Sequence, residues 1–227
     1  SYTRDPDSPI ETLTTDESGQ TPEINLKAPP RELSLTPDIT EQPYSEYNIQ
    51  VTAEGFETVL VSGSEILAGA YSLQPIRMNP LDVTEEEEKV VVIPPHTLFG
   101  EYPPKIPEEE IKPMNETGEI VLSRVVIPEY VIVHDGDPED PTARNYWVRY
   151  KDYIKNVASS EIYPTWSESA IYANILVIQS FTLNRVFTEW YRGKGYDFTI
   201  TSSTAYDQKW IYGRNVFEEI DYLVDSI

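Results

Sequence analysis

The chain has 227 residues with 39 acidic and 17 basic side chains, and its formal charge of −22 argues against binding to a nucleic-acid backbone or adhesion to anionic membranes. It has no cysteine, which excludes disulfides and thiolate metal sites, and only two histidines, too few for a histidine-rich zinc site. The 39% of hydrophobic residues can build cores, and because no apolar run reaches about 18 residues we expect no membrane insertion.

The first 80 residues carry short strand patterns divided by turn signals. Polar and apolar residues alternate over 47–53, a second apolar stretch covers 57–61, and a third covers 70–78. The segment 62–64, Ser-Gly-Ser, has the composition of a turn. The pattern over residues 10–80 predicts a small β-sandwich, and no catalytic pair is found in it.

Residues 81–124 have the composition of a linker. Acidic runs at 85–88 and 108–110 alternate with six prolines, which keep a chain extended. We expect this segment to be solvated and its end to be accessible to a protease.

From residue 125 the pattern changes to a mixed or helical one. An apolar stretch at 125–133 predicts a strand, and apolar spacing predicts helices over 150–160, 167–191 and 216–224. Ser167 is a favourable N-cap for the longest helix. The predicted fold class is therefore α+β, with a β N-terminal module, a Pro/Glu-rich linker and a mainly helical domain over 125–227.

Glu161 is the first candidate for chemistry. It lies at the end of an apolar helix pattern, beside Tyr163 and Trp166. A carboxyl group next to aromatic rings loses hydration, which raises its pKa and suits a general acid near neutral pH. The alternative is a solvated glutamate at a helix end, which is the commoner case.

Two segments resemble the SpoIID/LytB family of peptidoglycan lytic enzymes. The first runs from residue 152 to 170, and the second carries Tyr196, Asp197, Ser203, Thr204, Gln208 and Gly213. Together with the acidic N-terminal half, the chain is similar to the SleC-like spore-cortex-lytic enzymes. The resemblance implies a carboxypeptidase-regulatory-like β pro-domain over 1–80, the end of a pro-region over 81–124, and a SpoIID-like catalytic domain over 125–227.

The resemblance also implies an activity. Glu161 would protonate the glycosidic oxygen in a lytic transglycosylase that needs no cofactor and leaves a 1,6-anhydromuramic product. Four residues would hold the glycan of spore cortex peptidoglycan: Tyr163, Trp166, Tyr206 and Gln208. A serine protease would activate the precursor near Arg124, Val125 and Val126. The expected location is secreted, in the spore cortex and coat region.

The chain departs from the family pattern at several positions, and two other functions are considered beside the implied one. Many members bind zinc where this chain has Thr201, Ser202 and Ser203, so we expect no structural zinc. Gln179 stands where the family has an arginine, which puts that contact in doubt. Because similar proteins continue into a peptidoglycan-binding module, we expect a truncated chain. The alternatives are an N-acetylmuramoyl-L-alanine amidase on the same polymer and a non-catalytic peptidoglycan-binding protein, and the pro-region could act in inhibition or in folding.

Overall fold

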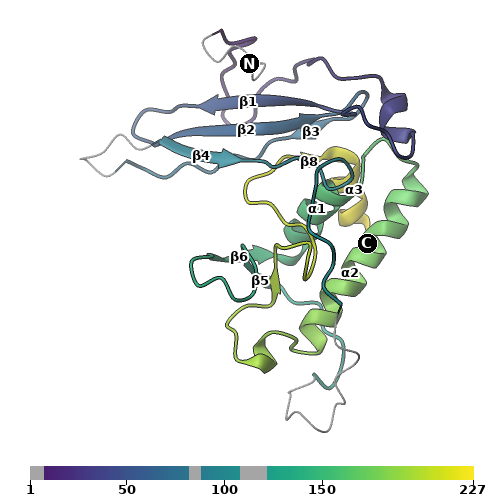
Figure 1. Cartoon of the computed structure of the whole chain (residues 1–227). Coiled ribbons are helices and arrows are strands. Elements are labelled where there is room, and N and C mark those ends of the chain that lie inside the picture. Colours follow the sequence, from purple (N-terminus) through teal and green to yellow (C-terminus); the bar gives the residue numbers. More distant parts are fainter. Residues whose placement is uncertain (1–7, 82–87, 108–121) are drawn as a thin grey trace. The chain divides into compact units, whose positions relative to one another are not determined.

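The computed structural model describes residues 8–81, 88–107 and 122–227 (Figure 1). Within these residues the fold is α+β, with three α-helices and several small sheets. The described residues form two compact units. The first holds the residues up to Pro94 together with Gly213–Glu218, and the second holds Pro95–Tyr212 together with Glu219–Ile227.

The segment predicted as a linker is shared between the two units. Its strand β4 (Glu88–Val92) belongs to the first unit, and residues 95–107, which we call the strap, belong to the second. Residues 85–87 and 108–110, which contain most of the acidic runs, lie outside the described residues. The described parts of the predicted linker are therefore packed into structural units.

A three-stranded sheet forms the first unit, in the order β1-β2-β4. Strand β1 (Ser45–Val51) pairs antiparallel with β2 (Thr58–Ile66), and β4 runs parallel to β2. The strands predicted over 47–53 and 57–61 are confirmed by β1 and β2. A short 3-10 helix, Arg31–Leu35, precedes them.

Strand β2 continues through the segment that the sequence predicts as a turn. Gly63 lies within β2 with φ 91°, and a Cβ atom at this position would come within 2.5 Å of the carbonyl oxygen of Ile93. Glycine in a strand often marks such a close approach of another backbone. The glycine at 62–64 therefore permits packing inside the sheet, and the turn prediction is wrong.

A second, two-stranded sheet in the first unit joins segments that lie far apart in the sequence. Strand β3 (Ser72–Leu73) pairs antiparallel with β8 (Val216–Phe217), in the register Ser72 to Phe217. The strand predicted over 70–78 is thus reduced to two residues. The helix predicted from residue 216 begins at residue 218, because the two residues before it form β8.

The second unit combines a three-stranded sheet with helices. Strands β6 (Asn145–Arg149), β5 (Tyr130–His134) and β7 (Ile200–Thr201) lie in the order β6-β5-β7, and β5 and β6 are antiparallel. The strand predicted over 125–133 begins later than expected, at Tyr130, two residues after Pro128, which cannot donate a ladder hydrogen bond.

The first two helices of this unit begin where the sequence pattern predicts. Helix α1 (Tyr150–Glu161) confirms the predicted helix at 150–160 and fully buries an apolar face of Tyr153, Ile154, Val157 and Ala158. Helix α2 (Glu168–Phe187) begins where predicted, and the Ser167 hydroxyl accepts a hydrogen bond from the Ala170 N–H.

Helix α2 ends four residues earlier than predicted, at Phe187 instead of residue 191. Glu189 has φ 49°, in the left-handed region that cannot continue a right-handed helix. The short helix Arg192–Lys194 follows, and α3 (Glu218–Ser226) ends the helical elements.

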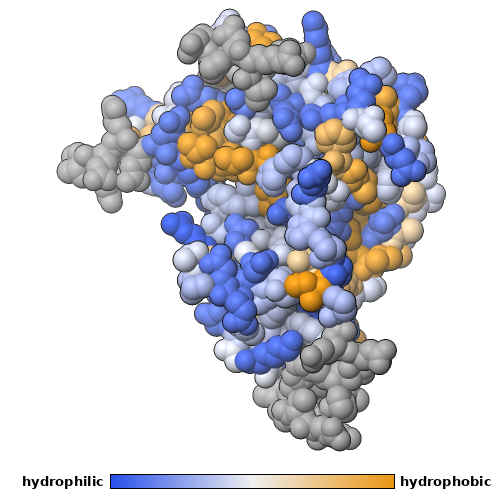
Figure 2. Space-filling view, in the orientation of Figure 1, coloured by the Kyte–Doolittle hydropathy of each residue, from blue (hydrophilic) through white to orange (hydrophobic). Residues whose placement is uncertain are grey.

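The surface on view is largely hydrophilic, with apolar patches between the charged residues (Figure 2). This matches the strongly acidic composition. Among the described residues, no helix combines the length and apolar character needed to cross a membrane.

Candidate functional site

A pocket of about 270 Å³ in the second unit contains Glu161. Its apolar lining comes from the end of α1 and one side of α2, and consists of Ile162, Val177, Ile178 and Phe181. Its polar lining consists of Lys105, Glu161, Asn174, Asp207 and Gln208. Two carboxyl groups, an ammonium group and two amides thus line the hollow beside four apolar side chains. Polar groups set among apolar side chains are typical of a ligand-binding site.

Glu161 is the last residue of α1, and its carboxyl group is held by the backbone of a distant segment. The main-chain N–H of Lys209 donates a hydrogen bond to Glu161 Oε1 at 2.7 Å. Burial raises the pKa of Glu161 to about 7, although this hydrogen bond and the positive charge of Lys105 each lower it. Because desolvation dominates, the group can hold a proton near neutral pH and can also release it.

Asn156, one turn earlier in α1, positions the segment that supplies this hydrogen bond. Its side-chain amide donates to the Ile211 carbonyl at 2.8 Å, and its side-chain oxygen accepts from the Ile211 N–H at 2.9 Å. This two-way pairing fixes the chain two residues beyond Lys209 against α1. The geometry at Glu161 therefore depends on a buried asparagine that the sequence analysis did not single out.

A buried ion pair lies beneath the polar side of the pocket. Arg185 Nε donates to Asp207 Oδ1 at 2.7 Å. The other oxygen of Asp207 accepts from the Tyr191 hydroxyl and from the N–H and hydroxyl of Thr201. Because both oxygens of Asp207 accept hydrogen bonds, this carboxylate holds the framework together.

Arg185 occupies a buried position on α2, in line with Ile171, Ile175, Ile178 and Thr182, whereas its neighbour Val186 is only partly buried. The arginine can be buried there because the Asp207 carboxylate neutralises its charge. In the sequence, the only sign of this ion pair is an arginine three positions after Thr182, within the predicted helix.

Gln208 is the one predicted glycan-holding residue that lines the pocket with Glu161. Its side-chain oxygen accepts from the hydroxyls of Thr182 at 2.9 Å and Tyr153 at 3.3 Å. Its amide nitrogen donates to the Ile178 carbonyl at 3.2 Å. These bonds connect Gln208 to both α1 and α2 and make it a support for the pocket floor.

The other three predicted glycan-holding residues are not among the described residues that line this pocket. Tyr163 is buried, and its ring packs 4.4 Å from the His96 ring and edge-on to Trp166 at 6.2 Å. The Tyr206 carbonyl accepts a hydrogen bond from Arg185 at 3.3 Å. The structure therefore brings Glu161 together with Gln208 and places Tyr163, Trp166 and Tyr206 beside the pocket framework.

Lys105 of the strap completes the polar side of the pocket. Its ammonium group donates to the Asp207 carbonyl at 3.2 Å and lies 4.7 Å from the centre of the Phe181 ring. The sequence analysis placed this lysine in a solvated linker. Since the contact depends on tertiary packing, no local signal in the sequence could have found it.

The predicted processing residues Arg124, Val125 and Val126 are exposed and have no regular secondary structure. An exposed, irregular backbone is the form that proteases bind. Among the described residues, no group of three or more histidine, aspartate or glutamate side chains is placed to hold a metal ion.

Comparison of the chain with protein-family models, with curated proteins and with solved structures finds no match. The function must therefore be argued from the site itself.

Proposed function

We propose that this chain is the precursor of a peptidoglycan lytic transglycosylase in which Glu161 is the general acid. The observation that carries the proposal is a carboxyl group with a pKa of about 7 that lines a pocket of about 270 Å³. A general acid works best when its pKa lies near the operating pH. The resemblance at residues 152–170 supplies the substrate class.

The reaction requires one proton donor and no external water. Protonated Glu161 gives its proton to the glycosidic oxygen as the bond from that oxygen to C1 of the muramic acid residue breaks. The 6-hydroxyl of the same sugar then attacks C1 and closes a 1,6-anhydro ring, and its proton returns to the Glu161 carboxylate. The group that acted as acid is thereby regenerated, as microscopic reversibility allows.

A single carboxyl group suffices because the substrate supplies the nucleophile. Hydrolytic glycosidases use two carboxyl groups, one as acid and one as nucleophile or base. Asp207, the other carboxylate that lines this pocket, is occupied by Arg185, Tyr191 and Thr201. The arrangement therefore favours transglycosylation over hydrolysis.

The precursor state is part of the proposal. The residues before Arg124 would form a pro-region built on a carboxypeptidase-regulatory-like β-module, and a serine protease would cut the exposed chain near Val125.

The pocket volume lies just below the range of roughly 300–1,000 Å³ typical of ligand sites. Lys105, which precedes the cut, lines the pocket, so the strap supports inhibition by partial occlusion. The expected substrate is spore cortex peptidoglycan, and the expected location is outside the cell.

The test is mass spectrometry of the products released from purified cortex peptidoglycan by the full chain after cleavage between residues 124 and 126. Products that end in 1,6-anhydromuramic acid, absent with Glu161→Gln and present with the exposed control Glu168→Gln, are expected. Reducing muramic acid ends would indicate a hydrolase, and released stem peptides would indicate an amidase. Binding without any released product would indicate a non-catalytic binding protein.

A further inference from the structure

The proposed cut separates two segments of the chain from most of the structural unit to which each belongs. The strap precedes Arg124 but is part of the second unit, whereas Gly213–Glu218 follows Val126 but is part of the first. We infer that cleavage between residues 124 and 126 leaves the two products bound to each other, because each product supplies part of the other's structural unit.

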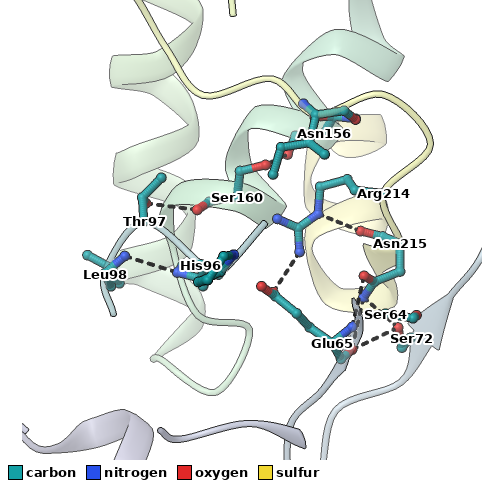
Figure 3. A network of polar contacts seen from close by, with 12 residues as sticks. Ser64, Glu65, Ser72, His96, Thr97, Leu98, Asn156, Ser160, Arg214 and Asn215 are labelled. Atoms are coloured by element: carbon teal, nitrogen blue, oxygen red, sulfur yellow. Dashed lines mark hydrogen bonds and ion pairs between the residues drawn. The ribbon is translucent and has the colours of Figure 1, made fainter. Parts of the chain in front are cut away.

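The downstream product contributes a buried cation to the first unit. Arg214 Nη2 lies 2.8 Å from Glu65 Oε2, and both side chains are almost completely inaccessible to solvent (Figure 3). If the downstream product dissociated, the buried Glu65 carboxyl group would lose the arginine with which it pairs. An ion buried without its partner is strongly unfavourable, so this pair opposes separation.

Asn215 connects the same two products through the backbone of β2. Its amide nitrogen donates to the Glu65 carbonyl at 2.9 Å and to the Ser72 hydroxyl at 2.8 Å, and its side-chain oxygen accepts from the Glu65 N–H at 3.2 Å (Figure 3). The fully buried Phe217 follows in strand β8, which pairs with β3. Polar groups, an aromatic side chain and a strand pairing all come from residues beyond the cut.

The upstream product contributes to the second unit through the strap. His96 is completely buried, with its ring 4.4 Å from the Tyr163 ring. The N–H and hydroxyl of Thr97 both donate to the Ser160 carbonyl at the end of α1, at 3.2 and 2.8 Å (Figure 3). The Ile106 N–H donates to the Ala205 carbonyl at 2.8 Å. Loss of the strap would expose the Tyr163 ring and leave the Ser160 carbonyl without the Thr97 donors.

The exchange of segments changes what activation requires. Removal of the whole pro-region would disrupt both units, whereas a cut leaves the contacts of His96, Thr97 and Ile106 in place. The inference rests on the proposed function only for the position of the cut.

An engineered cut tests the inference without peptidoglycan or the natural protease. A recognition sequence for a sequence-specific protease is inserted between Arg124 and Val125, and the purified, folded full chain is cut. Size-exclusion chromatography with light scattering should show one species with the mass of the uncut chain, while denaturing electrophoresis shows two fragments. Two separate species under native conditions would overturn the inference.

Variants show whether the exchanged segments hold the products. In the cut protein, Arg214→Ala and His96→Ala should each lower the urea concentration at which the fragments separate, whereas the exposed control Glu219→Ala should not change it. Equal resistance of all cut proteins would refute the role of the two segments. If a variant does not fold before the cut, the result for the unsubstituted protein still decides. Neither outcome depends on whether Glu161 is an acid catalyst, so failure of the proposed function is distinguished from failure of this inference.

Discussion

The N–H of Lys209 donates to the Glu161 carboxyl group at 2.7 Å, and the two residues are 48 positions apart in the chain. A backbone donor favours the charged carboxylate, yet the pKa of Glu161 is raised to about 7 because burial outweighs both this bond and the nearby Lys105. The donor thus fixes the direction of the carboxyl group while burial sets its proton affinity. A proton donor must be both oriented and protonated, and this site provides each property through a different interaction.

Glu161→Gln should stabilise the uncut protein at high pH. A carboxyl group whose folded pKa is raised from 4.5 to about 7 contributes its full stability below pH 4.5 and loses it as the pH rises to about 7. The free energy of unfolding of the variant should therefore exceed that of the wild type by at most about 3 kcal/mol near pH 8, and by much less near pH 4.5. Urea unfolding at several pH values measures the difference. Glu168→Gln, on the exposed first turn of α2, is the matched control, and a constant difference for Glu161→Gln across the pH range would contradict the raised pKa.

Lytic activity of the cut protein should decrease as the pH rises above about 7. A general acid acts only in its protonated form, whose fraction falls by about tenfold for each pH unit above the pKa. Product release from cortex peptidoglycan between pH 5 and 9 gives the profile. A rate that stays level or increases above pH 7 would exclude Glu161 as the acid.

Lys105→Met should raise the pKa of Glu161 in the uncut chain, because the ammonium group of Lys105 favours the carboxylate. The titration of the Glu161 side chain can be followed by NMR and assigned with Glu161→Gln. The same variant should increase the residual lytic activity of the uncut chain if the strap limits access to the pocket. Lys151→Met, an exposed lysine that pairs with Asp225, is the matched control and should change neither property. An unchanged Glu161 titration in Lys105→Met would show that the two charges do not interact.

Arg214→Met should destabilise the first unit by about 3–5 kcal/mol, because it leaves the buried Glu65 without its partner. The double variant Glu65→Gln/Arg214→Met should recover part of this loss, since no charge then remains in the buried site. Burial already raises the pKa of Glu65, so the single variant should be less destabilised at low pH, where Glu65 takes up a proton. Urea unfolding at two pH values measures both effects.

The exposed pair of Arg192 and Glu189 is the comparison for the buried one. Arg192→Met should cost less than about 1 kcal/mol, as is usual for a surface ion pair. Similar losses for Arg192→Met and Arg214→Met would show that the buried pair has no special contribution.

The sequence by itself determined the elements whose signals are local. The apolar face of α1, the Ser167 cap of α2 and the alternation in β1 each depend on residues within a few positions of one another, so the pattern predicts them correctly. The position of Glu161 at the end of an apolar helix is of the same kind. Its role as an acid remains a prediction.

Only the tertiary structure decided how the chain is divided and what surrounds Glu161. The inclusion of Gly213–Glu218 in the first unit depends on contacts such as that between Glu65 and Asn215, which are 150 residues apart. Lys105 lines the pocket and the Lys209 N–H donates to Glu161, and these two residues come from segments on either side of α1 in the chain. Local composition marks the strap as a linker because prolines and charges are typical of solvated chain. Burial of His96 and pairing with distant backbone groups, which local composition does not encode, make it part of a folded unit instead.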